Sequence, residues 1–411
     1  MIILVLNCGS SSIKYQLIRM SSQTEHKLLA KGLVERIGLT DGILTHKPTG
    51  KPKFEFVQSI PDHSVGINLI LDALTDEHHG VIGSLSEISA AGHRVTHGGE
   101  YFSDSAIVNS TVKQQIESCF KLAPLHNPAN LKGILSIERL LPTIPQVAVF
   151  DTSFHQTMPR ECYLYAIPYK YYEEDRIRRY GFHGTSHKYV AQKGCKMTGL
   201  DFEKSKVITC HIGNGASITA IKDGKSFDTS MGFTTVDGLM MGTRSGEIDP
   251  GVLLDIMDKE GLNTQKATDL INKQSGLLGV SGISSDWRDV REAAENGNDR
   301  AQLALDMYMF RLKRFVGAYM AELEGADLLV FTGGIAENVA KLRHTVCKGL
   351  ECMGIDLDNQ ANDAAYGEDA IISMPNSRVK VVVATTNEEL VIASDTFRLL
   401  RKRPETTTAQ E

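Results

Sequence analysis

The pattern of apolar and polar positions at the start of the chain recurs in its middle. A short apolar run at residues 2–6 precedes a turn of small residues, and a second apolar run at 207–212 precedes a similar turn. Each turn leads into a segment with alternating apolar positions, which begins at Ile13 in the first copy and at Ile218 in the second. This alternation predicts strand–turn–strand in both copies. Because turns with few bulky side chains expose backbone N–H groups that bind phosphate, the repeat indicates a duplicated domain that grips one polyphosphate from both sides.

The rest of the first half mixes strand and helix patterns. The opening segment is rich in short strand patterns, and helical periodicity follows at 64–74. A helix is predicted to begin at Asn127, which we expect to be its N-cap because Pro128 then occupies the first helical position. A short buried strand at 146–150 ends at Asp151. This mixture of strands and helices predicts an α/β domain.

The second half repeats this order, with a β-rich opening, two helical patterns and two short apolar strands. These segments lie at 206–230, 249–258, 299–323, 328–331 and 379–384. A last helical pattern begins at Glu388. No low-complexity linker separates the halves, so the repeat itself indicates a domain boundary, near residue 152.

Length and composition narrow the class of protein. A chain of 411 residues with 42% hydrophobic residues suits a globular protein of two domains. Its net charge of −6 argues against nucleic-acid binding, which needs a dense surface of Lys and Arg. The seven Cys residues include no C-x-x-C pair, which is typical of free thiols in a reducing compartment. The N-terminal apolar run is too short for a signal peptide, and no apolar run reaches the ~18 residues of a membrane span. We therefore expect a cytoplasmic protein that binds neither nucleic acid nor a membrane.

A third glycine-rich turn, TGGIAEN at 332–338, lies between a strand pattern and a helix pattern. Paired glycines let a nucleotide approach the backbone, and the helix N-terminus adds positive potential. Such junctions are common in α/β domains, but as the third turn of this kind it indicates a nucleotide site. Neither of the repeated turns matches G-x-x-x-x-G-K-[ST], which disfavours a P-loop enzyme. Lys14, which alternates with apolar neighbours on its strand, is placed to reach a phosphate.

Two arginines and two acidic residues are candidates for chemistry. Arg94 and Arg244 lie in glycine-bounded loops without nearby acidic partners, which favours capture of a carboxylate or phosphate over an ordinary surface role. Asp151 and Glu388 follow strands directly, and carboxylates at the carboxyl ends of strands face the ligand in α/β folds. We predict that they coordinate Mg²⁺, and the alternative for Glu388 is an acid in the first turn of a helix.

His183 and His187 have the i, i+4 spacing of zinc ligands, but the residues around them argue against zinc. Gly184 interrupts the helical register, and Ser186 resembles an N-cap, which places His183 on the loop before the helix. No Glu lies between the two histidines, and the sequence offers no evident third ligand. A zinc site is therefore not expected here.

Ten ordered segments between residue 2 and about residue 401 resemble the acetate kinase family. They are LNCGSSSIKYQL, GHRVTHGGEYF, LAPLHNPANL, VFDTSFHQTMP, RRYGFHGTSHKYV, HIGNGASITAIKDGKSFDTSMGFT, GLMMGTRSGEIDPG, VSGISSDWRDVR, FTGGIAEN and TNEELVIASD. The resemblance implies the superfamily of acetate and sugar kinases, actins and heat-shock chaperone ATPases, an α/β fold of two duplicated ribonuclease-H-like domains around a nucleotide cleft. The first domain would then comprise 1–152 and 387–411. The second, at 153–386, would bind the nucleotide and form the dimer.

The resemblance also implies which residues bind the substrates. The positions that match the family's nucleotide contacts are Ser12, Lys14, His211, Ile212, Gly213, Asn214, Gly215, Asp286, Trp287, Arg288, Gly333, Gly334, Ile335, Ala336 and Glu337. Asn7 and Glu388 match its ligands for Mg²⁺, which Mn²⁺ can replace. The substrate-binding positions are Arg94, which binds the acyl carboxylate, with Thr96, Leu125, His126, Phe182 and Thr235. The catalytic positions are Asp151, His183 and Arg244.

The implied reaction is direct in-line transfer of a phosphoryl group from ATP to acetate, which gives acetyl phosphate and ADP reversibly, as in acetyl-CoA biosynthesis. His183 and Arg244 would stabilise the transferring group, so that catalysis consists of positioning and charge neutralisation. The family assigns Asp151 as an acid/base residue. We interpret it as a residue that orients metal and substrate, because acetate is already deprotonated near pH 7 and needs no base. The resemblance also implies a homodimer.

Two of the four positions that line the acyl pocket depart from the family pattern. Val, Leu, Phe and Pro are usual there, and this chain has Thr96, Leu125, Phe182 and Thr235. Thr96 has nearly the shape of Val, which favours acetate, but a buried hydroxyl needs a partner and a Thr lacks the rigidity of Pro. Propionate is therefore the nearest alternative substrate. Ala336 replaces a frequent Gly, a small change that we expect to be tolerated.

The alternative function from another class of protein is an actin-like ATPase without an acyl substrate.

Overall fold

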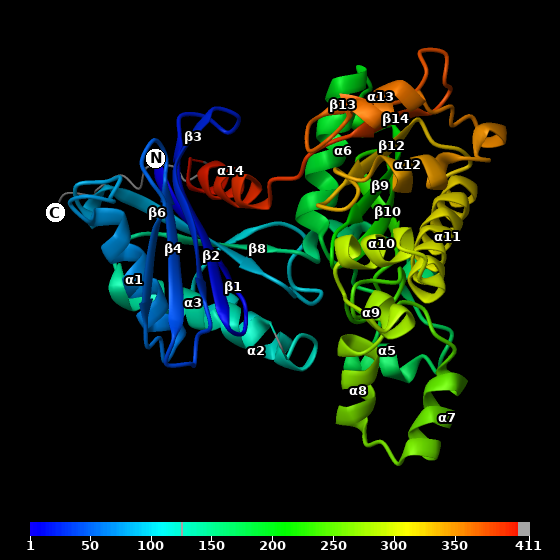
Figure 1. Ribbon diagram of the computed structural model, residues 1–411. Coiled ribbons are helices and arrows are strands. Elements are labelled where there is room, and N and C mark those ends of the chain that lie inside the picture. The colour runs from blue at the N-terminus through cyan, green and yellow to red at the C-terminus, as the bar shows by residue number, and fades with distance from the viewer. Residues whose placement is uncertain (125, 402–411) are drawn as a thin grey trace. The chain divides into compact units, whose positions relative to one another are not determined.

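The computed structural model describes residues 1–124 and 126–401, which form two compact units (Figure 1). The first unit comprises Met1–Ser153 and the segment from Asn387 onward. The second comprises Phe154–Thr386. Each unit is built around its own mixed sheet and has its own hydrophobic core.

The sheet of the first unit has eight strands in the order β5-β4-β3-β2-β1-β6-β8-β7. The strands are β1 (Ile2–Cys8), β2 (Ser12–Met20), β3 (His26–Glu35), β4 (Gly42–Pro48), β5 (Phe54–Gln58), β6 (Ile88–Val95), β7 (Ala106–Ile107) and β8 (Gln146–Phe150). Strands β1 to β5 form an antiparallel meander, whereas β1, β6 and β8 are parallel. The parallel strands therefore end at one edge, where Arg94 and Asp151 lie.

Helices cover both faces of this sheet, because alternate residues of the buried strand β1 point to opposite faces. Ile2, Leu4 and Leu6 share a core with α1 and α3, and Ile3 and Val5 share another with α14. The helices are α1 (His63–Thr75), α2 (Ser110–Ser118), α3 (Asn127–Leu140) and α14 (Glu388–Arg401), with short 3₁₀ turns at Leu85–Glu87, Cys119–Lys121 and Ser153–Thr157. Helix α14, far along the chain, thus packs against the strands that carry the predicted site residues (Figure 1).

A glycine allows α14 to approach β6 closely. A Cβ atom at Gly92 would lie 2.6 Å from Oγ1 of Thr396 and 2.7 Å from Cγ2 of Ile392, both on α14. Any larger residue there would push α14 away from the sheet. Since Glu388 is the first residue of α14, this contact also fixes where Glu388 lies relative to Arg94 on β6.

The predicted N-cap of α3 is wrong by one residue. His126 is the N-cap, and Asn127 is the first residue of the helix. The side chain of Asn127 turns instead to a distant loop, where its Oδ1 accepts the N–H of His97 at 3.0 Å. A tertiary hydrogen bond therefore takes the amide that the local sequence pattern assigns to the cap. By contrast, the N-cap of α1 is Asp62, whose side chain accepts the N–H of Val65 in the usual way.

The sheet of the second unit has six strands in the order β11-β10-β9-β12-β14-β13. The strands are β9 (Lys206–Ile212), β10 (Ala216–Lys222), β11 (Lys225–Thr229), β12 (Leu328–Thr332), β13 (Ala370–Ile371) and β14 (Lys380–Val383). As in the first unit, an antiparallel hairpin is joined to two parallel strands, here β12 and β14. The predicted strand–turn–strand repeat and the α/β fold class are confirmed.

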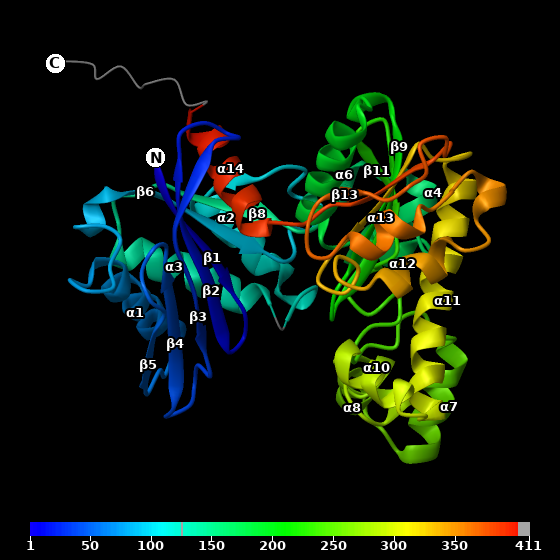
Figure 2. The ribbon, with the colours of Figure 1, turned by 45° about the horizontal axis from the view of Figure 1, so that its top comes forward.

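Helix α6 lies on one face of this second sheet and α11 on the other (Figure 2). On β12, Leu328 and Val330 pack toward α6, whereas Leu329 and Phe331 share a core with α11. The helices are α4 (Arg160–Tyr163), α5 (Lys170–Asp175), α6 (Gly184–Thr198), α7 (Pro250–Glu260), α8 (Thr264–Lys273), α9 (Gly276–Ser281), α10 (Trp287–Glu295), α11 (Asp299–Glu322), α12 (Ala340–Cys347) and α13 (Asn359–Ala364), with 3₁₀ turns at Phe202–Lys204 and Glu351–Met353. Among the described residues, no helix is long and apolar enough to cross a membrane.

Candidate active site

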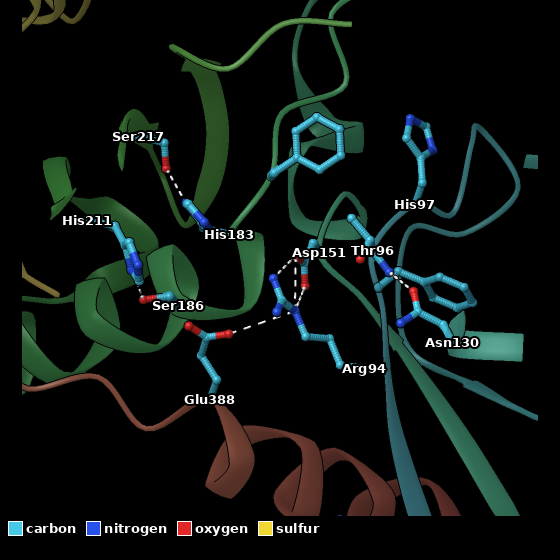
Figure 3. A network of polar contacts seen from close by, with 12 residues as sticks. Arg94, Thr96, His97, Asn130, Asp151, His183, Ser186, His211, Ser217 and Glu388 are labelled. Carbon is cyan, nitrogen blue, oxygen red and sulfur yellow. Dashed lines mark hydrogen bonds and ion pairs between the residues drawn. The ribbon is translucent and has the colours of Figure 1, made fainter. Parts of the chain in front are cut away.

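An arginine and two carboxylates meet at the carboxyl edge of the first sheet (Figure 3). Arg94, near the end of β6, donates from Nε to Oδ1 of Asp151 at 2.9 Å and from Nη2 to Oδ2 at 2.6 Å. Glu388 approaches the same guanidinium, with 3.9 Å between its Oε2 and Nε. The sequence offers Arg94 no nearby acidic partner on its own loop, and the fold supplies two from other segments of the first unit, Asp151 and Glu388.

The electrostatics of this cluster keep Arg94 charged and fixed. Burial disfavours the cation, but the attraction of Asp151 and Glu388 outweighs that effect and raises the pKa of Arg94. Asp151 is only 2% exposed, and the two-point contact holds its carboxylate in one orientation. One edge of the guanidinium is thus committed to Asp151.

Two of the residues predicted for the acyl pocket, Thr96 and His126, are connected with the start of α3. Thr96 is buried, and its N–H donates to Oδ1 of Asn130 at 3.0 Å. His126 is half-buried at the N-cap of α3. Leu125 lies outside the described residues. In the second unit, Phe182 is buried in the core directly before His183, and Thr235 is half-buried on the loop that leads to Arg244.

The first of the two predicted phosphate-binding turns is the tight connection of the β1–β2 hairpin. The N–H of Gly9 donates to the carbonyl of Ser12 at 2.8 Å, and Asn7 lies opposite Lys14 in the strand register. Residues opposite each other in an antiparallel pair share a face of the sheet. Lys14 is exposed, and its Nζ lies 2.6 Å from Oε1 of Glu389. Glu389 is not among the predicted site residues, and its position beside Glu388 in TNEEL is the sequence feature that could have indicated it.

Three histidines of the second unit form a hydrogen-bonded network with serine and threonine hydroxyls (Figure 3). His183 and His187 both contact Oγ of Ser217, at 2.8 and 2.7 Å, and His187 also contacts Oγ1 of Thr209 at 2.7 Å. Burial lowers the pKa of His187 well below its ordinary value, which keeps the ring neutral. The ring of His183 stacks on His211 with 4.3 Å between centroids. Both nitrogens of His187 thus serve to hold this network together.

The backbone of His183 has a conformation that is uncommon for a side-chain-bearing residue. Its φ is 56°, in the left-handed region, and it is the N-cap of α6, which begins at Gly184. Ser186 is therefore inside the helix, and its prediction as an N-cap is wrong. Its hydroxyl instead contacts Nδ1 of His211 and Oγ1 of Thr386, each at 2.8 Å. Positive φ turns the His183 ring toward the strand β10 rather than along the helix, as the contact with Ser217 requires.

His183 and Arg244 both lie beside Gly215, in the second predicted phosphate-binding turn. A Cβ atom at Gly215 would lie 3.5 Å from Nη1 of Arg244 and 3.8 Å from the His183 ring. Nη1 of Arg244 also donates to the carbonyl of Thr235 at 3.2 Å. Burial lowers the pKa of Arg244, and among the described residues of its unit no charge offsets that effect. The turn thus has a desolvated guanidinium and an imidazole beside a glycine backbone, which suits an anion.

The third glycine-rich turn is joined to the second by backbone hydrogen bonds. The N–H groups of Ile335 and Ala336 donate to the carbonyl of Ile212, at 2.9 and 3.3 Å. Gly333 has a φ of 86°, and its N–H donates to Oε1 of Glu337 at 2.8 Å. Glu337 therefore closes the turn on itself. Gly334 lies between them with open space where a Cβ would stand.

The segment at the start of α10 presents two charged residues around a buried ring. Asp286 caps the helix, because its Oδ1 accepts the N–H of Arg288 at 2.8 Å, and hydrogen bonds from Arg288 lower the pKa of Asp286 to about 2. Trp287 is buried and lies edge-on to Tyr308. The hydroxyl of Tyr308 donates to the carbonyl of Gly213 at 3.5 Å. Tyr308 thus links Gly213 to this helix start, in which Trp287 is a core residue, Asp286 is half-buried and Arg288 is exposed.

This fold and these sites suit a phosphotransferase, a class that the comparisons with known proteins narrow to enzymes that act on a carboxyl group. Its glycine turns suit phosphate, its arginines suit anions, and it has no P-loop. The chain matches the Acetokinase family over residues 2–394. It belongs to that family.

Individual relatives of known name are also acetate or propionate kinases. The chain is 53% identical over 400 residues to an acetate kinase of Caldanaerobacter subterraneus subsp. tengcongensis, with 97% of this chain and 99% of the relative covered. It is 54% identical over 401 residues to an acetate kinase of Bacteroides thetaiotaomicron, with 97% and 100% covered. The crystal structure of Porphyromonas gingivalis acetate kinase has a TM-score of 0.94 at 51% identity, with 97% and 99% covered. A propionate kinase from Francisella tularensis subsp. tularensis SCHU S4 has a TM-score of 0.89 at 43% identity, with 97% and 99% covered.

These findings confirm the predicted family, fold class and phosphotransferase activity. The named acetate kinases are more similar to this chain than the propionate kinase is, which favours acetate as the acceptor. Membership of the family also removes the alternative of an actin-like ATPase without an acyl substrate.

Proposed function

We propose that the acetate kinase reaction proceeds here by direct in-line attack of an acetate oxygen on the γ-phosphorus of ATP. A P–O bond to acetate forms as the bond to the β–γ bridging oxygen breaks, so that acetyl phosphate and ADP are the products. The single observation that carries this proposal is the convergence of Gly215, His183 and Arg244, a desolvated anion site beside a phosphate turn. The reverse reaction uses the same groups, since acyl phosphates are strong phosphoryl donors.

Arg94 is the proposed partner of the acetate carboxylate. Its charge is maintained by Asp151 and Glu388, and a planar guanidinium suits a planar carboxylate. We propose that Asp151 orients Arg94 and does not remove a proton, since acetate is already ionised. Its two-point contact with Arg94 supports an orienting role, because a base must instead present its lone pairs to the proton it takes.

His183 and Arg244 are the proposed groups that stabilise the transferring phosphoryl group. The Ser217 hydroxyl and the His211 ring hold the imidazole of His183 from two sides. The carbonyl of Thr235 holds the guanidinium of Arg244. Groups that are already oriented need no rearrangement when charge develops in the transition state, and each such contact is worth about 10²–10³ in rate.

Asn7 and Glu388 are the proposed ligands of Mg²⁺. An amide oxygen and a carboxylate are hard oxygen donors, which this ion prefers, and few protein ligands suffice because phosphate oxygens and water complete the shell. When bound, the metal supplies charge neutralisation at the phosphates. Mn²⁺ accepts the same donors. Both residues lie at the carboxyl edge of the first sheet, Asn7 on β1 and Glu388 at the start of α14.

The nucleotide is proposed to bind Ser12 and Lys14, residues 211–215, the start of α10, and the turn at 333–337. The carbonyl of Ile212, which accepts the N–H groups of Ile335 and Ala336, makes the second and third turns one surface. Gly334 leaves that surface open. Lys14 would exchange its contact with Glu389 for one with a phosphate, which costs little because its side chain is exposed.

The acyl pocket is proposed to consist of Thr96, Leu125, His126, Phe182 and Thr235, and to admit acetate in preference to propionate. Thr96 is buried and no larger than Val, which limits the space for a longer chain. We also propose a cytoplasmic location and a homodimer through the domain at 153–386. The homodimer is supported by Phe310, 68% exposed on α11, beside a hollow of about 300 Å³ lined by Glu247, Met307, Phe310, Arg311 and Arg314.

Trapping with hydroxylamine tests the reaction. The full-length chain with ATP, Mg²⁺, acetate and hydroxylamine is expected to form acetyl hydroxamate, whereas omission of acetate or chelation of the metal removes the product. Propionate and butyrate in place of acetate give the chain-length preference in the same assay. Steady ATP hydrolysis without hydroxamate would contradict the proposed reaction.

A further inference from the structure

Strands β1 and β6 separate before they end. Their parallel pairing runs from Ile2 opposite Ile88 to Leu6 opposite His93, although β1 continues to Cys8 and β6 to Val95. Diverging carboxyl ends of neighbouring strands form the ligand crevice in α/β folds. Here the opening lies between Asn7 on one strand and Arg94 on the other.

One side chain bridges that opening. Asn130, which is 3% exposed on α3, accepts the N–H of Thr96 with Oδ1 at 3.0 Å and donates from Nδ2 to the carbonyl of Cys8 at 2.8 Å. Figure 3 shows Asn130 directed at Thr96. The amide thus takes the place of the backbone hydrogen bonds that end at Leu6 and His93. The identity of its two partners fixes its orientation, because an N–H needs an acceptor and a carbonyl needs a donor.

The helix that carries Asn130 packs closely against β1. Gly133, one turn after Asn130 on the same face of α3, lies against β1, since a Cβ there would be 2.6 Å from Sγ of Cys8. The helix therefore cannot shift along the strand without a clash. Cys8 follows Asn7 directly, and Thr96 is two residues beyond Arg94.

We propose that Asn130 is a positioning residue for phosphoryl transfer, which sets the separation between the metal-binding end of β1 and the carboxylate-binding end of β6. This inference rests on the proposed roles of Asn7 and Arg94. The Asn130 amide supplies both groups that the bridge needs, an acceptor for the N–H of Thr96 and a donor for the carbonyl of Cys8. An ionised Asp lacks the donor, and Ala lacks both groups.

Asn127 provides a matched control on the same helix. It is also buried, and it accepts the N–H of His97 at 3.0 Å and donates to the carbonyl of His97 at 2.9 Å. These two bonds go to the β6 side of the opening, and a third, from Nδ2 to the carbonyl of Ile116 at 3.3 Å, goes to α2, so Asn127 anchors the loop without bridging to β1. Loss of either Asn removes buried hydrogen bonds, but only loss of Asn130 releases the two strand ends from each other.

The experiment compares Asn130→Asp and Asn130→Ala with Asn127→Asp and Asn127→Ala in the full-length chain. The hydroxamate assay at pH 5.5–8 gives kcat and the KM values for acetate and Mg-ATP, and thermal unfolding gives stability. Both Asn130 variants are expected to lower kcat by at least about tenfold at pH 7.5, because displacement of reacting groups by ~1 Å costs up to about 10²-fold. Both Asn127 variants are expected to lose stability while kcat stays within about twofold of the wild type.

The pH dependence of kcat in the Asn130→Asp variant distinguishes a positioning role from a merely structural one. The carboxyl group introduced by Asn130→Asp regains a donor when it is protonated. The kcat of this variant relative to wild type is therefore expected to rise as the pH falls, whereas kcat of Asn130→Ala is not. Equal kcat in the Asn130→Ala and Asn127→Ala variants would overturn the inference, and this comparison stands even if Asn130→Asp does not fold. A wild-type chain that forms no hydroxamate would instead contradict the proposed reaction, which separates the two failures.

Discussion

Removal of Arg244 should separate catalysis from stability. Its guanidinium is half-buried and donates to the carbonyl of Thr235 and to Sδ of Met241, at 3.2 and 3.5 Å. Within the described part of its unit, no carboxylate lies within ion-pair distance of it. Burial alone therefore acts on its charge, and the pKa is lowered. A cation desolvated without a partner costs free energy in the folded state, which an anionic substrate can offset.

The expected sizes of the two effects, on stability and on kcat, follow from this uncompensated charge. The Arg244→Ala variant loses two weak contacts but also the burial of an uncompensated charge, so the free energy of unfolding should change by no more than about 1 kcal/mol. In the proposed transition state the same residue faces the charge of the transferring group. Its loss should lower kcat by about 10²–10³, or about 3–4 kcal/mol, with a much smaller rise in KM.

Arg94 offers the opposite case. Its partner Asp151 is 2% exposed and would be left without the two-point contact in an Arg94→Ala variant. That variant should lose about 2–3 kcal/mol of stability, since breaking a buried pair leaves an uncompensated charge, and should raise the KM for acetate.

Urea unfolding at pH 7.5 and initial-rate kinetics with varied acetate and ATP measure both variants. Arg244→Lys is the control for charge, and it should recover part of kcat because a lysine keeps the charge but not the planar fork. A near-normal kcat in Arg244→Ala would refute the assigned role. A loss of stability as large as that of Arg94→Ala would refute the argument from uncompensated charge.

Three further outcomes are expected. Asp151→Asn should lower kcat without shifting the pH at which activity declines, whereas a lost pH limb would restore a role as a base. The free energy of unfolding should fall as the pH is lowered from about 6.5 to 4. Burial lowers the pKa of His155 to about 4, so as the pH falls the unfolded state binds a proton before the folded state does. For one such residue the slope approaches about 1.4 kcal/mol per pH unit. His155→Gln should flatten that slope in urea unfolding at a series of pH values, and an unchanged slope would contradict the assignment. Phe310→Glu should weaken the proposed homodimer in light scattering at micromolar concentration, whereas Tyr101→Glu, at an exposed position of the other unit, should not.

Local patterns made the two hairpins predictable. Residues 2–6 and 207–212 are mostly apolar, and polar and apolar positions alternate after each turn, a signal that depends only on neighbouring residues. The glycine turns and the strand-terminal positions of Asp151 and Glu388 could be found for the same reason. Arg94 and Arg244 looked alike in sequence because both lie in glycine-bounded loops.

The predictions failed where a distant group competed with a local one. Asn127 has the sequence features of an N-cap, but its amide binds His97, and Ser186 binds His211 instead of capping its helix. Glu389 and Asn130 could not be singled out, since each acts through a partner far along the chain. Lys14 finds Glu389 only because α14 returns to the first sheet.

The sequence by itself determined the elements, the family and the chemical types available for catalysis, because these depend on short-range periodicity and on residue identity. Only the tertiary structure decided which charges are compensated. Arg94 is paired, since β6 and β8 are neighbours in parallel and place it beside Asp151, whereas Arg244 lies against a glycine turn with no acid beside it in the described part of its unit. Strand order and register come from contacts between segments far apart in the chain, so the electrostatic difference between two similar arginines appears only after folding.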